Sequence, residues 1–146
     1  RDLISMSWLA REYSIGSTNI FDSLIYIRED QAEWLVKLFL KHAKNQDLFL
    51  LGRSFKPETN ITAGSAAMLV ADLLKTYGRR FTHYDPFVDG STYFESCASE
   101  KGAYLIATNH KCFQNLKFGK DSVVIDPFRV IQPQEGVEII HVGIGK

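Results

Sequence analysis

The stretch Leu48-Phe49-Leu50-Leu51-Gly52 decides the fold, because four consecutive apolar residues end abruptly at a glycine. A short continuous apolar run is typical of a strand buried on both faces of a parallel sheet. Four further runs of this kind follow along the chain. They lie at residues 81–84, 104–107, 123–125 and 137–142.

Helical segments are expected between these strands. Gly64-Ser65 should open a helix that continues through Tyr77 and ends at Gly78, and a short helix is expected over 93–99. Strands that alternate with helices predict an α/β fold, here a Rossmann-like parallel sheet of about five strands with helices on both faces. Ligands of such sheets bind outside the carboxyl ends of the strands. The loops to inspect are therefore 52–64, 85–90, 108–113 and 126–130.

The first 46 residues have a different pattern. Residues 3–15 are expected to form a short amphipathic helix that stops at Gly16, and Ser17-Thr18-Asn19 offers an N-cap for the next helix. That helix runs through 19–44 without proline or glycine and would span roughly 37 Å. It is either a core helix or a connecting, dimer-forming helix. We favour the second, because residues 47–146 look complete without it, and we predict a helical linker over 1–46 followed by a domain over 47–146.

Bulk composition excludes several classes of protein. The chain has 146 residues, with 17 basic and 17 acidic side chains, so nothing points to a nucleic-acid partner. No apolar stretch approaches the roughly 18 residues of a membrane span, and no signal peptide is recognised. Cys97 and Cys112 have no metal-ligand spacing, so we expect no metal and interpret them as reduced thiols in a cytoplasmic protein. The start at Arg1 without methionine suggests a fragment, a processed product or a domain.

The loop that follows the first strand is the most informative candidate site. It places an aromatic residue, Phe55, beside a cation, Lys56, between a buried strand and a helix. A ring can stack on a base or sugar, and an ammonium can neutralise a phosphate near a helix N-terminus. The alternative is an ordinary solvated lysine. Neither a Walker A motif nor a Gly-x-Gly-x-x-Gly cradle is present.

Other polar residues of these loops are weaker candidates. Arg129, after the fourth strand, could contact a phosphate or could simply bond loop carbonyls. Asp85 could be a strand-end cap or could hold a ribose hydroxyl, and we favour the cap. Cys112 has a small chance of being a reactive thiol. The four histidines, which lie on different elements, are more typical of surface or core positions than of catalysis. They are His42, His83, His110 and His141.

Several motifs together resemble the C-terminal part of the UDP-glucose/GDP-mannose dehydrogenase family. Leu51-Gly52-Arg53-Ser54-Phe55-Lys56-Pro57-Glu58-Thr59 resembles the family's Gly-x-x-Phe-Lys-x-x-Thr signature, and Tyr84-Asp85-Pro86 matches its Tyr-Asp-Pro. Ala107-Thr108 with Phe113 resembles Ala-Thr-Glu-Trp-x-x-Phe, and Asp126-Pro127-Phe128-Arg129 resembles Asp-x-Arg. Arg1-Asp2 looks like the end of Cys-Phe-Pro-Lys/Arg-Asp.

The resemblance implies an enzyme, most similar to UDP-glucose 6-dehydrogenases, that oxidises the C6 hydroxyl of a nucleotide sugar to a carboxylate. Such enzymes use two NAD+ per turnover and a cysteine that would precede Arg1 here. Phe55, Lys56 and Arg129 then match positions that contact the UDP-sugar, and Asp2 matches the aspartate that assists the cysteine. Residues 19–44 match a linking helix that forms a homodimer, and NAD is bound mainly by a domain that this chain lacks. The chain alone is therefore predicted to be inactive.

Two departures from the family pattern keep a second hypothesis open. Asn109-His110 replace Glu-Trp, and Ala63 stands where many members carry an arginine that reaches NAD. The alternative is a non-catalytic nucleotide-binding or interaction module that reuses the fold. A third and weaker option, another nucleotide-dependent enzyme on a flavodoxin-like sheet, has no local motif in its favour.

Overall fold

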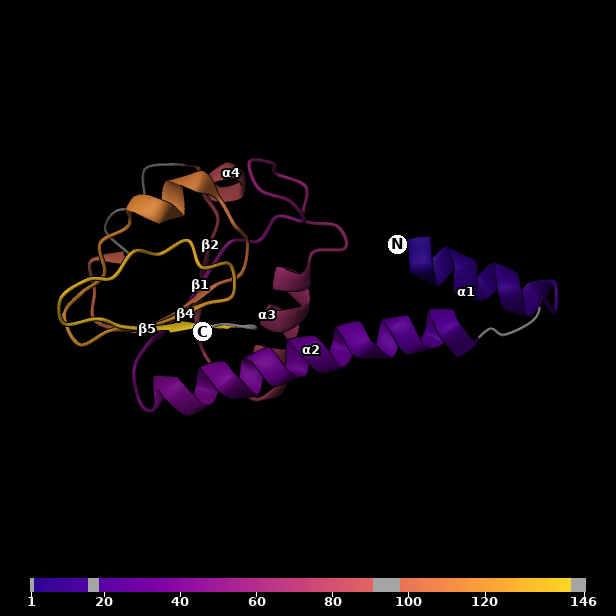
Figure 1. The fold of residues 1–146 in the computed structure, drawn as a ribbon, viewed down its shortest axis with the longest axis horizontal. Helices are drawn as coiled ribbons and strands as arrows, with labels where there is room; N and C mark the ends of the chain where they lie inside the picture. The colour runs from indigo at the N-terminus through magenta and orange to yellow at the C-terminus, as the bar shows by residue number, and fades with distance from the viewer. Residues whose placement is uncertain (1, 16–18, 91–97, 143–146) are drawn as a thin grey trace.

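The computed structural model describes residues 2–15, 19–90 and 98–142, and shows a two-helix hairpin joined to an α/β unit (Figure 1). All five strands predicted from the apolar runs are present, each within one residue of its expected bounds. In chain order the elements are α1 Asp2–Glu12, α2 Asn19–Ala43, β1 Leu48–Leu51, α3 Ala66–Thr76, β2 Thr82–Tyr84, α4 Pro86–Asp89, β3 Ala103–Ile106, the 3-10 helix η2 Lys111–Asn115, β4 Val123–Asp126 and β5 Glu138–His141.

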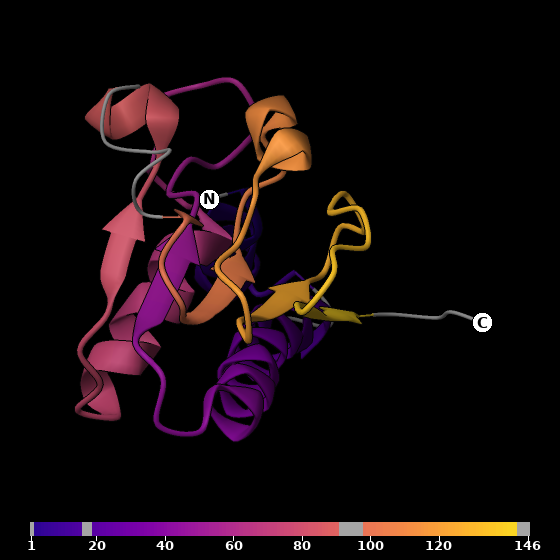
Figure 2. The same cartoon turned by 90° about the vertical axis from the view of Figure 1, so that its left-hand side faces the viewer.

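The strands form one parallel sheet in the order β2-β1-β3-β4-β5. In Figure 2, β2 lies at one side of the sheet and β5 at the other, with α2 against one face. Strands β1, β3 and β4 are buried throughout, whereas the edge strands β2 and β5 are partly exposed. This matches the sequence, because the continuous apolar runs belong to strands that are covered on both faces.

One face of the sheet is covered by α3 and by the C-terminal half of α2. Val36 and Phe39 of α2 are fully buried in the same cluster as Leu50 of β1 and Leu105 of β3. The N-cap of α3 is Ser65, whose hydroxyl accepts a hydrogen bond from the Ala67 amide, as the sequence predicts. The C-terminal half of α2 and the sheet therefore share one hydrophobic core.

Among the described residues, the second face is covered by irregular segments and by η2. Phe113 of η2 and Ile131 are buried against Tyr104 and Val124 of the sheet. Tyr104 also stacks on Phe49 of β1, with ring centroids 4.7 Å apart. The helix expected over 93–99 falls almost entirely outside the described residues. So do the stop at Gly16 and the proposed cap at 17–19, apart from the backbone of residue 19.

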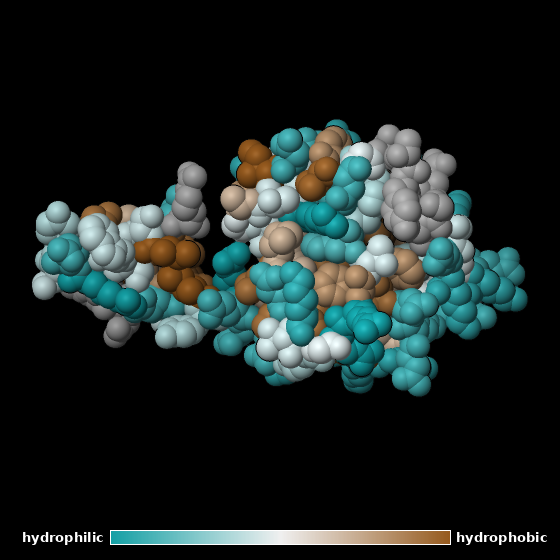
Figure 3. Space-filling view, turned by 180° about the vertical axis from the view of Figure 1, so that it is seen from behind, coloured by the Kyte–Doolittle hydropathy of each residue, from teal (hydrophilic) through white to brown (hydrophobic). Residues whose placement is uncertain are grey.

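The hairpin of α1 and the N-terminal half of α2 extends away from the α/β unit (Figure 1). Its apolar side chains remain largely uncovered, and Figure 3 shows brown side chains on this arm among hydrophilic ones. Ile4, Trp8, Tyr26 and Ile27 are all more than half exposed. No helix among the described residues is long and apolar enough to cross a membrane.

Candidate functional site

The loops after β1 and β3 meet at the point where the strand order reverses. The chain goes from β1 outward to β2 and then returns past β1 to β3, so the two loops leave in opposite directions. Ligands of doubly wound sheets bind at such a switch point. Gly52 opens the first loop with a φ of 104°, and a Cβ there would lie 2.5 Å from the Cβ of Thr108 in the second. Only glycine allows this close approach.

Asp85, at the end of β2, fixes the start of the β1 loop. Its carboxylate is fully buried and accepts hydrogen bonds from the amides of Arg53 at 2.7 Å and Ser54 at 2.9 Å. The other oxygen caps α4 through the amides of Phe87 and Val88. Burial raises the pKa of Asp85, but hydrogen bonds from His110 and from these amides outweigh it and hold the pKa well below its usual range. The expected structural role of Asp85 as a cap is thus confirmed.

His110 links the β3 loop to the β1 loop from inside the protein. The ring is fully buried, with Nε2 3.0 Å from Asp85 Oδ2 and 3.1 Å from Ser54 Oγ. On its other side, Nδ1 lies 3.0 Å from the backbone nitrogen of Glu58. The ring also stacks on Phe87, at a centroid separation of 4.8 Å. His110 is therefore a core histidine, as its sequence position suggested, but one that is bonded to both candidate loops.

Phe55 and Lys56 project from the loop that these contacts hold. Both side chains are exposed, and Lys56 Nζ lies 5.8 Å from the centre of the Phe55 ring. The Lys56 carbonyl accepts hydrogen bonds from the hydroxyls of Ser54 and Thr59, and the Phe55 amide donates to the Ile61 carbonyl at 2.7 Å. The aromatic–ammonium pair expected from the sequence thus lies at the carboxyl edge of a central parallel strand, on an ordered backbone.

The other two candidate residues lie further away. Arg129 is exposed, with a φ of 58°, in a turn after β4 that Asp126 caps through the amides of Phe128 and Ile131. Since β3 separates β4 from β1, the two loops start about 10 Å apart on the same edge. Asp2 begins α1, at the end of the hairpin that turns back toward the α/β unit (Figure 1).

The structure also shows residues that hold the two site loops together and that were not predicted as site residues from the sequence. Ser54, Glu58 and His110 join the two loops, and only the departure Asn109-His110 from the family pattern drew attention to this region. Desolvation raises the pKa of the Cys112 thiol, and the Glu58 carboxylate adds to the effect, which disfavours the reactive thiolate. Among the described residues, no group of three or more His, Cys, Asp or Glu side chains could hold a metal ion.

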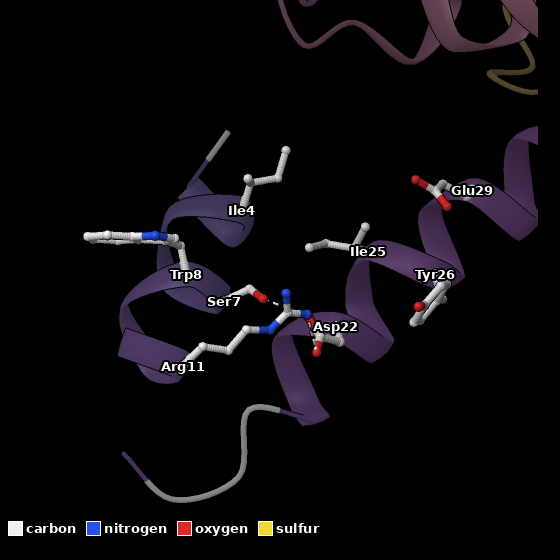
Figure 4. A pocket seen from close by; sticks show the side chains of 8 residues that line it. All are labelled: Ile4, Ser7, Trp8, Arg11, Asp22, Ile25, Tyr26 and Glu29. Carbon is white, nitrogen blue, oxygen red and sulfur yellow. Dashed lines mark hydrogen bonds and ion pairs between the residues drawn. The ribbon is translucent and has the colours of Figure 1, made fainter. Parts of the chain in front are cut away.

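Two hollows lie away from the Phe55–Lys56 pair. One, of about 420 Å³, separates α1 from α2, and Figure 4 shows Ile4 and Ile25 reaching toward it. In its wall the Asp22 carboxylate accepts hydrogen bonds from Arg11 at 2.7 Å and Ser7 at 2.6 Å (Figure 4). The second, of about 550 Å³, lies beside β2. It is lined by Arg53, Met68, Lys75, Arg79, Arg80, Phe81 and His83.

The sequence model for the UDP binding domain of the UDP-glucose/GDP-mannose dehydrogenase family matches residues 49–133. The match covers more than half of the chain and includes most of β1, the Phe55–Lys56 loop, His110 and Arg129. The chain belongs to the UDP-glucose/GDP-mannose dehydrogenase family. The family identification made from the Phe-Lys and Tyr-Asp-Pro motifs is therefore confirmed. No curated protein sequence matches the chain.

Solved structures of related dehydrogenases share the fold. A UDP-glucose dehydrogenase from Pyrobaculum islandicum superposes with a TM-score of 0.77 at 21% identity, over 97% of this chain and 35% of its own. A GDP-mannose dehydrogenase from Pseudomonas aeruginosa gives 0.76 at 14% identity, over 94% and 37%. A UDP-N-acetyl-mannosamine dehydrogenase from Staphylococcus aureus gives 0.62 at 23% identity, over 75% and 30%. The chain thus spans about a third of the length of these dehydrogenases and has their fold.

Proposed function

We propose that this chain is the UDP-sugar-binding portion of an NAD-dependent nucleotide-sugar dehydrogenase of the family. The reaction would be oxidation of the C6 hydroxyl of UDP-glucose, or of a related UDP-sugar, to a carboxylate. Phe55 and Lys56 would contact the nucleotide sugar, and Arg129 would bind a phosphate. Asp2 would assist the catalytic cysteine, which the family motif places before Arg1.

The Phe55–Lys56 pair at the switch point carries this proposal. An exposed ring can stack on a base or sugar, and a neighbouring ammonium can neutralise a phosphate. Both backbone positions are fixed by hydrogen bonds within the loop, so little conformational entropy is lost when a ligand binds. Arg129 follows β4 on the same edge of the sheet, about two strand spacings from the loop that carries the pair. This separation suits a ligand with the length of a diphosphate.

The residues of this chain do not fit a dinucleotide. No Gly-x-Gly-x-x-Gly turn follows a strand, and Ala63 provides no charge where many members carry an arginine. NAD would therefore be held mainly by residues that are not part of this chain. What the chain itself supplies is orientation and charge for the sugar nucleotide.

Calorimetric titration of the chain with UDP-glucose tests the proposal. We expect saturable binding and a rise in melting temperature, because a ligand that binds only the folded state stabilises it. Lys56→Ala should weaken binding about tenfold or more, which corresponds to the loss of one charge-assisted hydrogen bond. Lys41→Ala, which removes another exposed lysine on α2, is the matched control and should bind as the wild type does. If the Lys56→Ala variant bound UDP-glucose with wild-type affinity, Lys56 would not have the ligand contact that we assign to it.

We also propose that the chain forms a homodimer through residues 19–44. The N-terminal half of α2 exposes Ile20, Leu24 and Ile27, and α1 adds Trp8 on the same arm. A contiguous exposed apolar surface of this kind favours association. Sedimentation equilibrium at micromolar concentration should give twice the chain mass of 16.6 kDa. A monomer at all concentrations would contradict the proposal.

The second candidate is a nucleotide-binding module without catalysis, which Ala63 and the absence of a dinucleotide cradle favour. Both candidates predict UDP-glucose binding, so titration does not separate them. The coding sequence upstream of Arg1 does. A reading frame that continues upstream through Gly-x-Gly-x-x-Gly and Cys-Phe-Pro supports the dehydrogenase, and a start codon immediately before Arg1 supports the module.

A further inference from the structure

The hydrogen bonds around His110 determine which ring nitrogen carries the proton. The Glu58 amide has a hydrogen to donate and lies 3.0 Å from Nδ1, so Nδ1 must accept. The proton is then on Nε2, which donates to the Asp85 carboxylate at 3.0 Å, with the Ser54 hydroxyl at 3.1 Å. Every polar atom of this buried ring has a partner in the neutral state, and a protonated Nδ1 would face an amide hydrogen.

The bond from Glu58 to His110 fixes an unfavourable stretch of backbone. Glu58 has a φ of 61°, in the left-handed region that residues with side chains rarely adopt. Two contacts oppose its relaxation, namely the bond from its amide to His110 and the bond from the Lys111 amide to its carboxylate at 3.0 Å. Glu58 comes two residues after Lys56, whose carbonyl is held by Ser54, itself in contact with the same ring.

We propose that His110 is a positioning residue for nucleotide binding, whose neutral ring clamps the Glu58 backbone and thereby sets the direction of the Phe55–Lys56 pair. This inference rests on the proposed function of that pair. His110 does not touch the ligand in this scheme. It acts from inside the protein, because its two nitrogens connect Asp85 at the end of β2 to the turn that follows Lys56.

Three substitutions of His110 separate its two bonds. His110→Asn keeps an acceptor near the Nδ1 position, whereas His110→Gln reaches toward Asp85 and lacks the acceptor for Glu58. His110→Ala removes both bonds. We measure UDP-glucose affinity by calorimetry at pH 8.

At pH 8 we expect the Asn variant to bind within about threefold of the wild type, and the Gln and Ala variants to bind about tenfold more weakly, as loss of one or two hydrogen bonds implies. If folded Gln and Ala variants bind as the wild type does, the proposal is wrong.

Ligand-free nuclear magnetic resonance of the wild type tests the clamp even if the variants do not fold. Long-range ¹H–¹⁵N spectra of the ring should show the proton on Nε2. A proton on Nδ1 would overturn the clamp. Failure of the wild type to bind UDP-glucose at pH 8, with these spectra as expected, would instead count against the proposed function.

Discussion

The two halves of α2 carry apolar residues at the same helical spacing, yet they meet opposite environments. In the C-terminal half, Val36 and Phe39 are fully buried against the sheet. In the N-terminal half, Ile20 is 58% exposed and Ile27 is 52% exposed. Helical periodicity therefore shows that a face is suited to burial, but not what covers it. The C-terminal half of α2 packs against the sheet of its own chain. We propose that a second copy of the chain covers the N-terminal half.

The largest difference between the two halves should appear in stability. Phe39→Ala empties a fully buried site and should lower the free energy of unfolding by about 3–5 kcal/mol. Ile27→Ala, on the exposed half of the same helix, should change it by less than about 0.5 kcal/mol in the monomer. Urea denaturation at low protein concentration measures both. Similar losses for the two variants would show that the hairpin is part of the same cooperative core.

A buried carboxylate of the α/β unit, Asp85, should also make a large contribution to stability. Asp85 is fully buried in the α/β unit, so Asp85→Asn should cost about 3 kcal/mol by leaving backbone amides without an acceptor. Since the pKa of Asp85 is lowered on folding, its contribution is present above the unfolded value of about 3.9 and is lost as pH falls toward the folded value. Denaturation should therefore show wild-type stability level at pH 5 and decreasing below about pH 4, with a weaker decrease in the variant. Parallel pH curves would contradict this assignment.

A methyl group at the switch point tests how tightly the two site loops meet. Gly52→Ala should destabilise the fold by about 1–3 kcal/mol, because the backbone is left-handed there and the new Cβ meets Thr108. Gly78→Ala is the matched control, since Gly78 has a φ of 67° but nothing within 4 Å of the new Cβ. Thermal unfolding should show the larger loss for Gly52. If the two variants lost equal stability, the cost at Gly52 would come from its backbone conformation alone and not from the contact with Thr108.

The smallest effect is expected at the ion pair of the hairpin. The Arg11 hydrogen bond, followed by that of Ser7, lowers the pKa of Asp22, but the pair is exposed to solvent and screened. Arg11→Ala should leave the global unfolding transition unchanged and increase amide hydrogen exchange within α1 only. A shift of the global transition would show that α1 is coupled to the α/β unit.

Much of the fold could be predicted from local pattern. The apolar runs gave the five strands, and Gly64-Ser65 gave the start of α3, because burial and capping leave signals within a few residues. Pattern did not show that the C-terminal half of α2 covers one face of the sheet together with α3. It also did not show which of the described irregular segments pack on the other face, because such segments have no periodicity to detect.

The sequence by itself determined the family, the parallel sheet and the position of Phe55 and Lys56 after a buried strand. The tertiary structure alone decided the sheet order β2-β1-β3-β4-β5, and with it the meeting of the loops after β1 and β3. It alone joined His110 to Asp85, 25 residues away, and to Glu58, 52 residues away. The physical reason is that helix and strand propensities act between near neighbours, whereas hydrogen-bond partners this far apart are brought together only by packing.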